Sequence, residues 1–161
     1  MSLTEVSSIL WRERELLELL VFKLEEEQLL LAAGRARWLT FATREVEMVL
    51  AEIKRSELGR AVEVDAVAVQ LGLPAGISLR ELAERVPAPW DNILKEHRKA
   101  FLALSDEITE LAKTNRDLLG AGFRTARDTL LSLGDAEPPT YTPSGQSAAK
   151  PRGPLLVNQA I

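Results

Sequence analysis

Leucine recurs at every seventh position from the start of the chain. The row consists of Leu3, Leu10, Leu17, Leu24 and Leu31. A seven-residue repeat places these side chains in one seam along a helix of roughly 45 Å. Val6 and Leu20 extend the seam, whereas Glu13 and Glu27 interrupt it. Because a helix with such a stripe needs partner helices to cover it, the repeat predicts an α-helical bundle.

The spacing predicts a first helix from about Leu3 to Ala32, with Gly34 just beyond its end. A second helix is expected from Arg35–Trp38 to about Leu71. Its apolar row is Val46, Leu50, Ile53, Val64, Val67 and Leu71, with polar interruptions at Glu57 and Arg60. The stretch 62–67 also alternates with period two, which is typical of a strand. We prefer a helix there because the sequence offers no second strand for pairing.

A connector with its own short helix is predicted between the second and third long helices. Glycine and proline at 72, 74 and 76 end the second helix. Ser78 followed by Glu81 is a capping box, which predicts a short helix over 79–85. Pro87 and Pro89 break the chain again, and Pro89 suits the first turn of the next helix.

The third long helix is expected from Trp90 to about Leu133. Its row, in steps of four and three, is Trp90, Leu94, His97, Phe101, Leu104, Ile108, Leu111, Asn115, Leu118 and Gly122. The fold class is therefore all-α: an antiparallel bundle of three long helices with coiled-coil-like packing.

Two regions are expected along the chain, a helical domain over 1–133 and a tail over 134–161. Five of the eight prolines lie in the tail, beside serine and glycine. Such a composition buries too little apolar surface to offset ordering entropy, so we predict disorder there. The apolar segment 155–157 is an exception that could dock elsewhere.

Composition argues against several classes of function. The 161 residues include no cysteine and one histidine, which excludes disulfides and multi-histidine metal sites. The net charge of −4 argues against nucleic-acid binding. No apolar run reaches the ~18–20 residues that cross a bilayer, and no basic and apolar leader opens the chain. We therefore expect neither secretion by a cleaved signal nor stable membrane insertion.

Catalytic and cofactor motifs are not evident. The glycines at 72 and 76 lack the Lys-Ser/Thr continuation of a phosphate-binding loop. A di-iron bundle needs repeated Glu-x-x-His, yet Leu94 precedes His97 at that spacing. We expect no enzyme, no metal and no cofactor.

Four polar or aromatic residues could each have one of two roles. His97 is either a hydrogen-bonded seam residue or a pH sensor, and we favour the former. Asn115 is either a buried residue that fixes helix register or a half-exposed one. Trp38 and Trp90 begin helices, where we expect them to cover the ends of the core rather than form a ligand site.

The third helix is too long for its partners. At roughly 66 Å, against about 45 and 55 Å for the others, its last turns should overhang the bundle. Those turns carry Leu118, Leu119, Phe123, Leu130, Leu131 and Leu133. An exposed apolar stripe marks an interaction surface. Gly120 and Gly122 weaken the helix there and leave it adaptable. Self-association through the same stripe is the competing interpretation.

The chain resembles the FlgN-type flagellar export chaperones over most of residues 8–145. The resemblance begins with the acidic, leucine-rich first helix. The other matching segments are Thr43-Arg44-Glu45-Val46-Glu47 with Leu50, Leu71-Gly72-Leu73-Pro74, Leu111 with Asn115-Arg116-Asp117-Leu118-Leu119, and Tyr141-Thr142-Pro143-Ser144-Gly145. The last resembles the Tyr-x-x-x-Gly of the family. Pro138-Pro139, which separates this tyrosine from the helix, and the tail after Gly145 depart from the family pattern.

The resemblance implies a cytoplasmic chaperone for the hook–filament junction proteins, which holds their terminal helices before type III export. Combined with the overhang, it gives the expected client-binding residues Asn115, Leu118, Leu119, Phe123 and Leu130. It implies that Tyr141 docks on the export gate. The alternative is a structural coiled-coil protein that forms homodimers through the stripe at 118–133.

Overall fold

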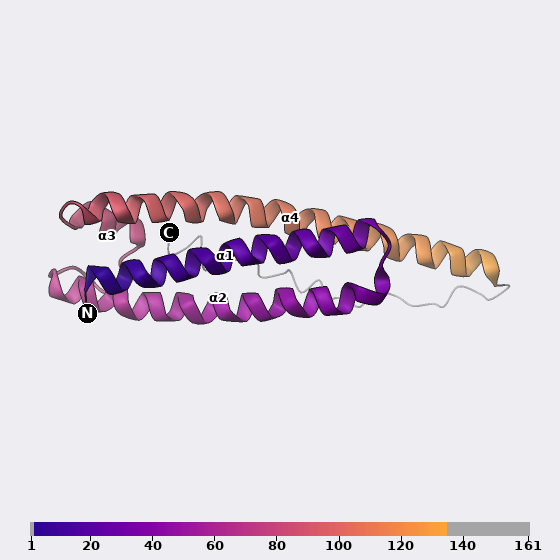
Figure 1. The fold of residues 1–161 in the computed structure, drawn as a ribbon, viewed down its shortest axis with the longest axis horizontal. Helices are drawn as coiled ribbons and strands as arrows, with labels where there is room; N and C mark the ends of the chain where they lie inside the picture. The colour runs from indigo at the N-terminus through magenta and orange to yellow at the C-terminus, as the bar shows by residue number, and fades with distance from the viewer. Residues whose placement is uncertain (1, 135–161) are drawn as a thin grey trace.

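The computed structural model describes residues 2–134, which form four helices and no strand. They are α1 (Leu3–Ala32), α2 (Ala36–Gln70), α3 (Leu79–Arg85) and α4 (Trp90–Leu133). The three long helices run up, down and up, with α1 between α2 and α4 (Figure 1). The predicted all-α bundle with a short helix in the second connector is confirmed. The tail expected to be disordered lies, apart from Gly134, outside the described residues.

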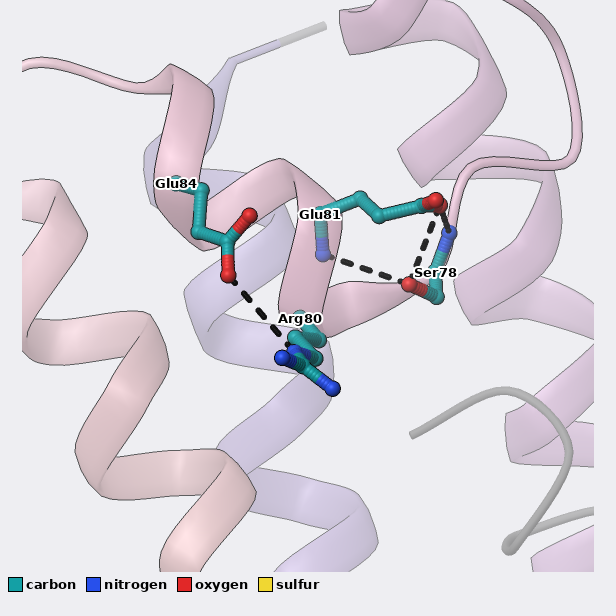
Figure 2. A network of polar contacts seen from close by, with 4 residues as sticks. All are labelled: Ser78, Arg80, Glu81 and Glu84. Carbon is teal, nitrogen blue, oxygen red and sulfur yellow. Dashed lines mark hydrogen bonds and ion pairs between the residues drawn. The ribbon is translucent and has the colours of Figure 1, made fainter.

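Local hydrogen bonds explain why two helices begin where the sequence predicts. Ser2 and Glu5 form a capping box at the start of α1, and Ser78 and Glu81 form another at α3. In α3 the Ser78 backbone N–H donates to Glu81 Oε2 at 3.0 Å, and the Glu81 N–H donates to Ser78 Oγ at 3.2 Å (Figure 2). Each cap satisfies backbone donors that a helix start leaves free. Gly34, at φ +65°, turns the chain between α1 and α2.

α1 is the central helix of the bundle. It packs along both α2 and α4, whereas the backbones of α2 and α4 scarcely approach each other. The seam residues Val6, Leu10, Leu17, Leu20 and Leu24 are all buried. From α4, Leu94, Phe101 and Ile108 complete the core.

The polar interruption at Glu13 is part of the packing. Its carboxylate is fully buried and lies 3.1 Å from Nη1 of Arg60, whose side chain is also buried. The Arg60 guanidinium stacks 5.9 Å from the ring centroid of Phe101 on α4. The polar residues that interrupt the apolar rows of α1 and α2 therefore pair with each other. Together with the ring of Phe101, this pair connects α1, α2 and α4 at the same height along the bundle.

The inward side of α2 differs from the expected row. Leu50 and Leu71 are exposed, and Val49 and Ala68 are buried instead. Val49 lies on the buried side of α2, whereas Leu50, one position further along the helix, lies on its exposed side. The possible strand over 62–67 is continuous α-helix. Pro89 precedes the first turn of α4 as its N-cap residue rather than lying within it.

Candidate functional site

The end of α4 projects beyond the other helices. Figure 1 shows α4 continuing past the turn that joins α1 to α2. Every residue from 121 to 134 is exposed. The structure thus confirms the expectation, drawn from helix lengths, that the third long helix outreaches its partners. The overhang is a single helix without lateral support from residues 2–120.

Large apolar side chains follow one face of this overhang. Leu119, Phe123, Leu130 and Leu133 are between 53% and 80% exposed. Their spacing, with Ala126 between them, is 4–3–4–3, which keeps them on one side of the helix. We call these four residues the distal stripe. The other residues of 124–132 are mostly arginine, threonine, aspartate and serine, with Leu131 exposed beside the stripe, so this part of α4 is amphipathic and fits the apolar face of another helix.

A groove of about 330 Å³ lies at the base of the overhang. It is formed where α4 passes the turn between α1 and α2. Its apolar wall consists of Leu30, Leu31, Leu39, Leu118, Leu119 and Phe123. We call it the distal groove. The segment 30–39 and the distant helix α4 build it together, so the helical row of α4 alone could not reveal it.

Gly122 borders open space in the distal groove. It lines the groove, and a Cβ built on it would meet no atom within 4 Å. The glycine is therefore not required by close packing inside the protein. The open space at this position leaves room for a side chain from outside between α4 and the turn at Gly34.

Asn115 lies below the exposed surface. It is buried, and its Nδ2 donates to the backbone oxygen of Leu24 at 2.9 Å and to Oε1 of Glu27 at 3.1 Å. The other carboxylate oxygen of Glu27 accepts from Oγ1 of Thr43 at 3.2 Å. These three side chains, which we call the distal clamp, join α4, α1 and α2 where the bundle ends. The structure therefore places Asn115 with the helix contacts and separates it from Leu119 and Phe123.

Further aromatic surface lies on the first turns of α2. Trp38 and Phe41 are both about half exposed, with ring centroids 5.9 Å apart. The guanidinium of Arg37 lies 4.8 Å from the ring centroid of Trp38. The expectation that Trp38 covers the end of the core is wrong, because α2 turns this ring outward. Trp90 is partly buried and packs against the core as expected.

The family model described as FlgN protein matches residues 1–149. The chain belongs to the FlgN family. FlgN proteins are flagellar chaperones, so the fold and the exposed stripe belong to a chaperone of flagellum assembly. No curated protein and no solved structure matches the chain.

Two expectations about individual residues have different outcomes in this FlgN-family chain. His97 is a buried seam residue: Trp11 packs edge-on at 4.9 Å between ring centroids, and Ser7 Oγ lies 3.5 Å from Nε2. Burial, together with the charge of Arg14, lowers the pKa of His97. Tyr141 lies inside the family match but outside the described residues, so its docking role stays a prediction.

Two further findings concern residues 2–134 only. No helix in that range has an apolar stretch long enough to span a bilayer. In the same range, no three acidic, histidine or cysteine side chains gather as metal ligands would.

Proposed function

We propose that this FlgN-family protein is a cytoplasmic chaperone that binds the amphipathic terminal helices of flagellar hook–filament junction proteins before type III export. The distal stripe is the observation that carries the proposal. It is a long, unsupported and regularly spaced apolar face in a family of flagellar chaperones. A client helix laid along it would bury both apolar faces.

The distal groove gives such a helix an anchoring position. A large side chain of the client inserts between Phe123 and Leu39, while the rest of its apolar face follows the stripe toward Leu133. Binding energy concentrates where a side chain enters a desolvated pocket. We therefore assign client recognition to Leu118, Leu119, Phe123 and Leu130, with Asn115 holding α4 in place beneath them.

The expected affinity is moderate. Terminal segments that are unfolded before assembly must become helical on the chaperone, and this ordering costs part of the interaction free energy. Moderate affinity suits a client that must be released for secretion.

Charged substitutions in the stripe test the proposal. We expect Leu119→Asp combined with Phe123→Asp to weaken binding of a synthetic junction-protein terminal peptide at least about 100-fold, because two large apolar contacts are lost. Isothermal titration calorimetry measures this. Phe22→Asp, which alters a ring on α1 that is 55% exposed and lies outside the distal stripe, is the matched control. Undiminished binding by the double variant would refute the assignment.

The role proposed for Tyr141 follows from the family resemblance. We expect Tyr141→Ala to leave peptide binding unchanged and to reduce capture of the export-gate protein in a pull-down. Loss of peptide binding instead would place Tyr141 in the client site.

A further inference from the structure

The distal groove is lined almost entirely by apolar groups. Arg35 is the one charged residue among those that line it, and Leu119 and Phe123 on its α4 side are 53% and 73% exposed. Apolar surface in contact with water is unfavourable, and burying a charge is costly. The groove therefore favours an occupant with apolar and uncharged side chains, whether or not a client is present.

The chain itself carries a segment of this chemistry after α4. Within residues 135–161, adjacent large apolar side chains occur only at Leu155, Leu156 and Val157, and no residue of 155–161 is charged. Tyr141 is the one large aromatic residue in the same range. We call residues 155–161 the tail segment. It lies beyond the family match, which ends at residue 149, so membership of the FlgN family does not account for it.

The order of residues in the tail segment resembles that of an amphipathic helix. Leu156 and Ala160 are four positions apart, as are Val157 and Ile161, whereas the polar pair 158–159 lies between them. In a helix, residues four apart share a face, and residues two apart lie on opposite faces. The tail segment thus has the same pattern that the distal groove and stripe would recognise in a client helix.

The tail segment can reach the distal groove of its own molecule. The groove residues Leu119 and Phe123 precede the end of α4 at Leu133 by 14 and 10 positions, which corresponds to about 15–21 Å along the helix. Residues 135–154 connect α4 to the tail segment, and a flexible chain of that length spans about 22–27 Å on average. The average span is close to the distance required, which is where a tether gives its highest effective concentration, in the millimolar range.

We propose that the tail segment docks in the distal groove of the same molecule and is displaced from it by a client helix. Before a client arrives, the docked segment covers Leu119 and Phe123. The docking follows from the groove and the tether alone, whereas its regulatory effect rests on the proposed function. A competitor that occupies the groove lowers the apparent affinity for the client in proportion to the fraction of molecules left free.

Nuclear magnetic resonance of the full chain tests the docking without a client. The variant Leu155→Ser/Leu156→Ser/Val157→Ser removes the large apolar side chains, and Ala148→Ser/Ala149→Ser is the matched control in the same tail. We expect the triple variant, and not the control, to shift the backbone amide signals of residues 30–39 and 118–123 relative to the natural chain.

Three outcomes of this measurement would overturn the docking. Unchanged signals in both groove segments would show that the groove is free. Shifts confined to another part of the bundle would place the tail segment elsewhere. Shifts that disappear on dilution of the natural chain would show docking between molecules instead of within one.

Cross-linking provides a second test, because the natural chain has no cysteine. We expect Leu119→Cys/Leu156→Cys to form its intramolecular disulfide about tenfold faster under mild oxidation than Leu133→Cys/Leu156→Cys. Position 133 is exposed and nearer to the start of the tail, so a tether without docking would reach it at least as readily. Equal rates, or a faster reaction at position 133, would contradict docking in the groove.

Peptide titration then tests the regulatory effect. The triple serine variant should bind the junction-protein terminal peptide at least about threefold more tightly than the natural chain, and the alanine-to-serine control should bind as the natural chain does. Unchanged affinity of the triple variant would refute regulation of the client site. The resonance and cross-linking tests involve no client, so the docking can fail while the proposed function stands, and the reverse.

Discussion

At the scale of single residues, the buried pair of Glu13 and Arg60 dominates the centre of the bundle. Burial raises the pKa of Glu13 to about 7, opposed by the charge of Arg60 and reinforced by that of Glu57. The folded state therefore holds a proton on Glu13 at pH values where the unfolded state has lost it. It follows that the contribution of Glu13 to stability decreases as the pH rises from about 4.5 to 7.

Glu13→Gln tests whether the contribution of Glu13 to stability falls as the pH rises. Glutamine resembles the protonated carboxyl, so the variant and the natural chain should have similar stability near pH 4.5. Between there and pH 7 the variant should become progressively more stable than the natural chain. Urea denaturation across that pH range measures the free energy of unfolding of both proteins. Groups that titrate equally in both, such as His97, cancel in the difference. A difference that does not change with pH would contradict the raised pKa.

Removing Arg60, the partner of Glu13, should lower the free energy of unfolding. Arg60→Ala leaves the Glu13 carboxylate buried without an opposite charge, and we expect a loss of about 3–5 kcal/mol in the free energy of unfolding at pH 8. Glu13→Leu/Arg60→Met should recover most of it, because an apolar pair replaces the ionic one. Thermal and urea unfolding provide the values. A double variant as unstable as Arg60→Ala would show that the pair has a further structural role.

At the scale of elements, α4 consists of a supported part and a free part, and the distal clamp marks the boundary. Gly122 lies beyond the clamp and lines the distal groove, so a larger side chain at this position would enter the groove. We expect Gly122→Phe to fill the groove and weaken peptide binding about tenfold or more. Gly122→Ala is the matched control, which should raise helicity and leave binding nearly unchanged. Calorimetry and circular dichroism measure both, and equal binding by the two variants would exclude the groove as an anchor.

Most of the elements could be predicted because their signals are local. The capping box at Ser78 set the start of α3, and the leucine heptad set the buried side of α1. Leu50 could not be placed, because apolar spacing alone does not decide which of the adjacent Val49 and Leu50 lies on the side packed against α1. The distal groove was missed for the same reason: Leu39 joins Phe123 only through the turn at Gly34. Apolar spacing describes one helix at a time, and it carries no information on the distance to the next.

At the scale of the whole molecule, the packed core and the proposed client-binding surface occupy different parts of the chain. The described core lies between Val6 and Asn115, and the exposed overhang follows it. A chain that ends at residue 119 should therefore unfold as cooperatively as the full chain, with a midpoint shifted by only a few degrees, and should lose peptide binding. Differential scanning calorimetry and titration measure the two properties. A large loss of stability would show that residues beyond 119 support the bundle.

The last turns of α4 are exposed on all sides. Since α4 ends as one rod in water, a cargo segment lying against it stays accessible along its whole outer side while it is bound. Under the proposed function, the export machinery would detach the client helix one turn at a time, so that only a few contacts break at each moment. Release of the client would then require no conformational change in the helical bundle.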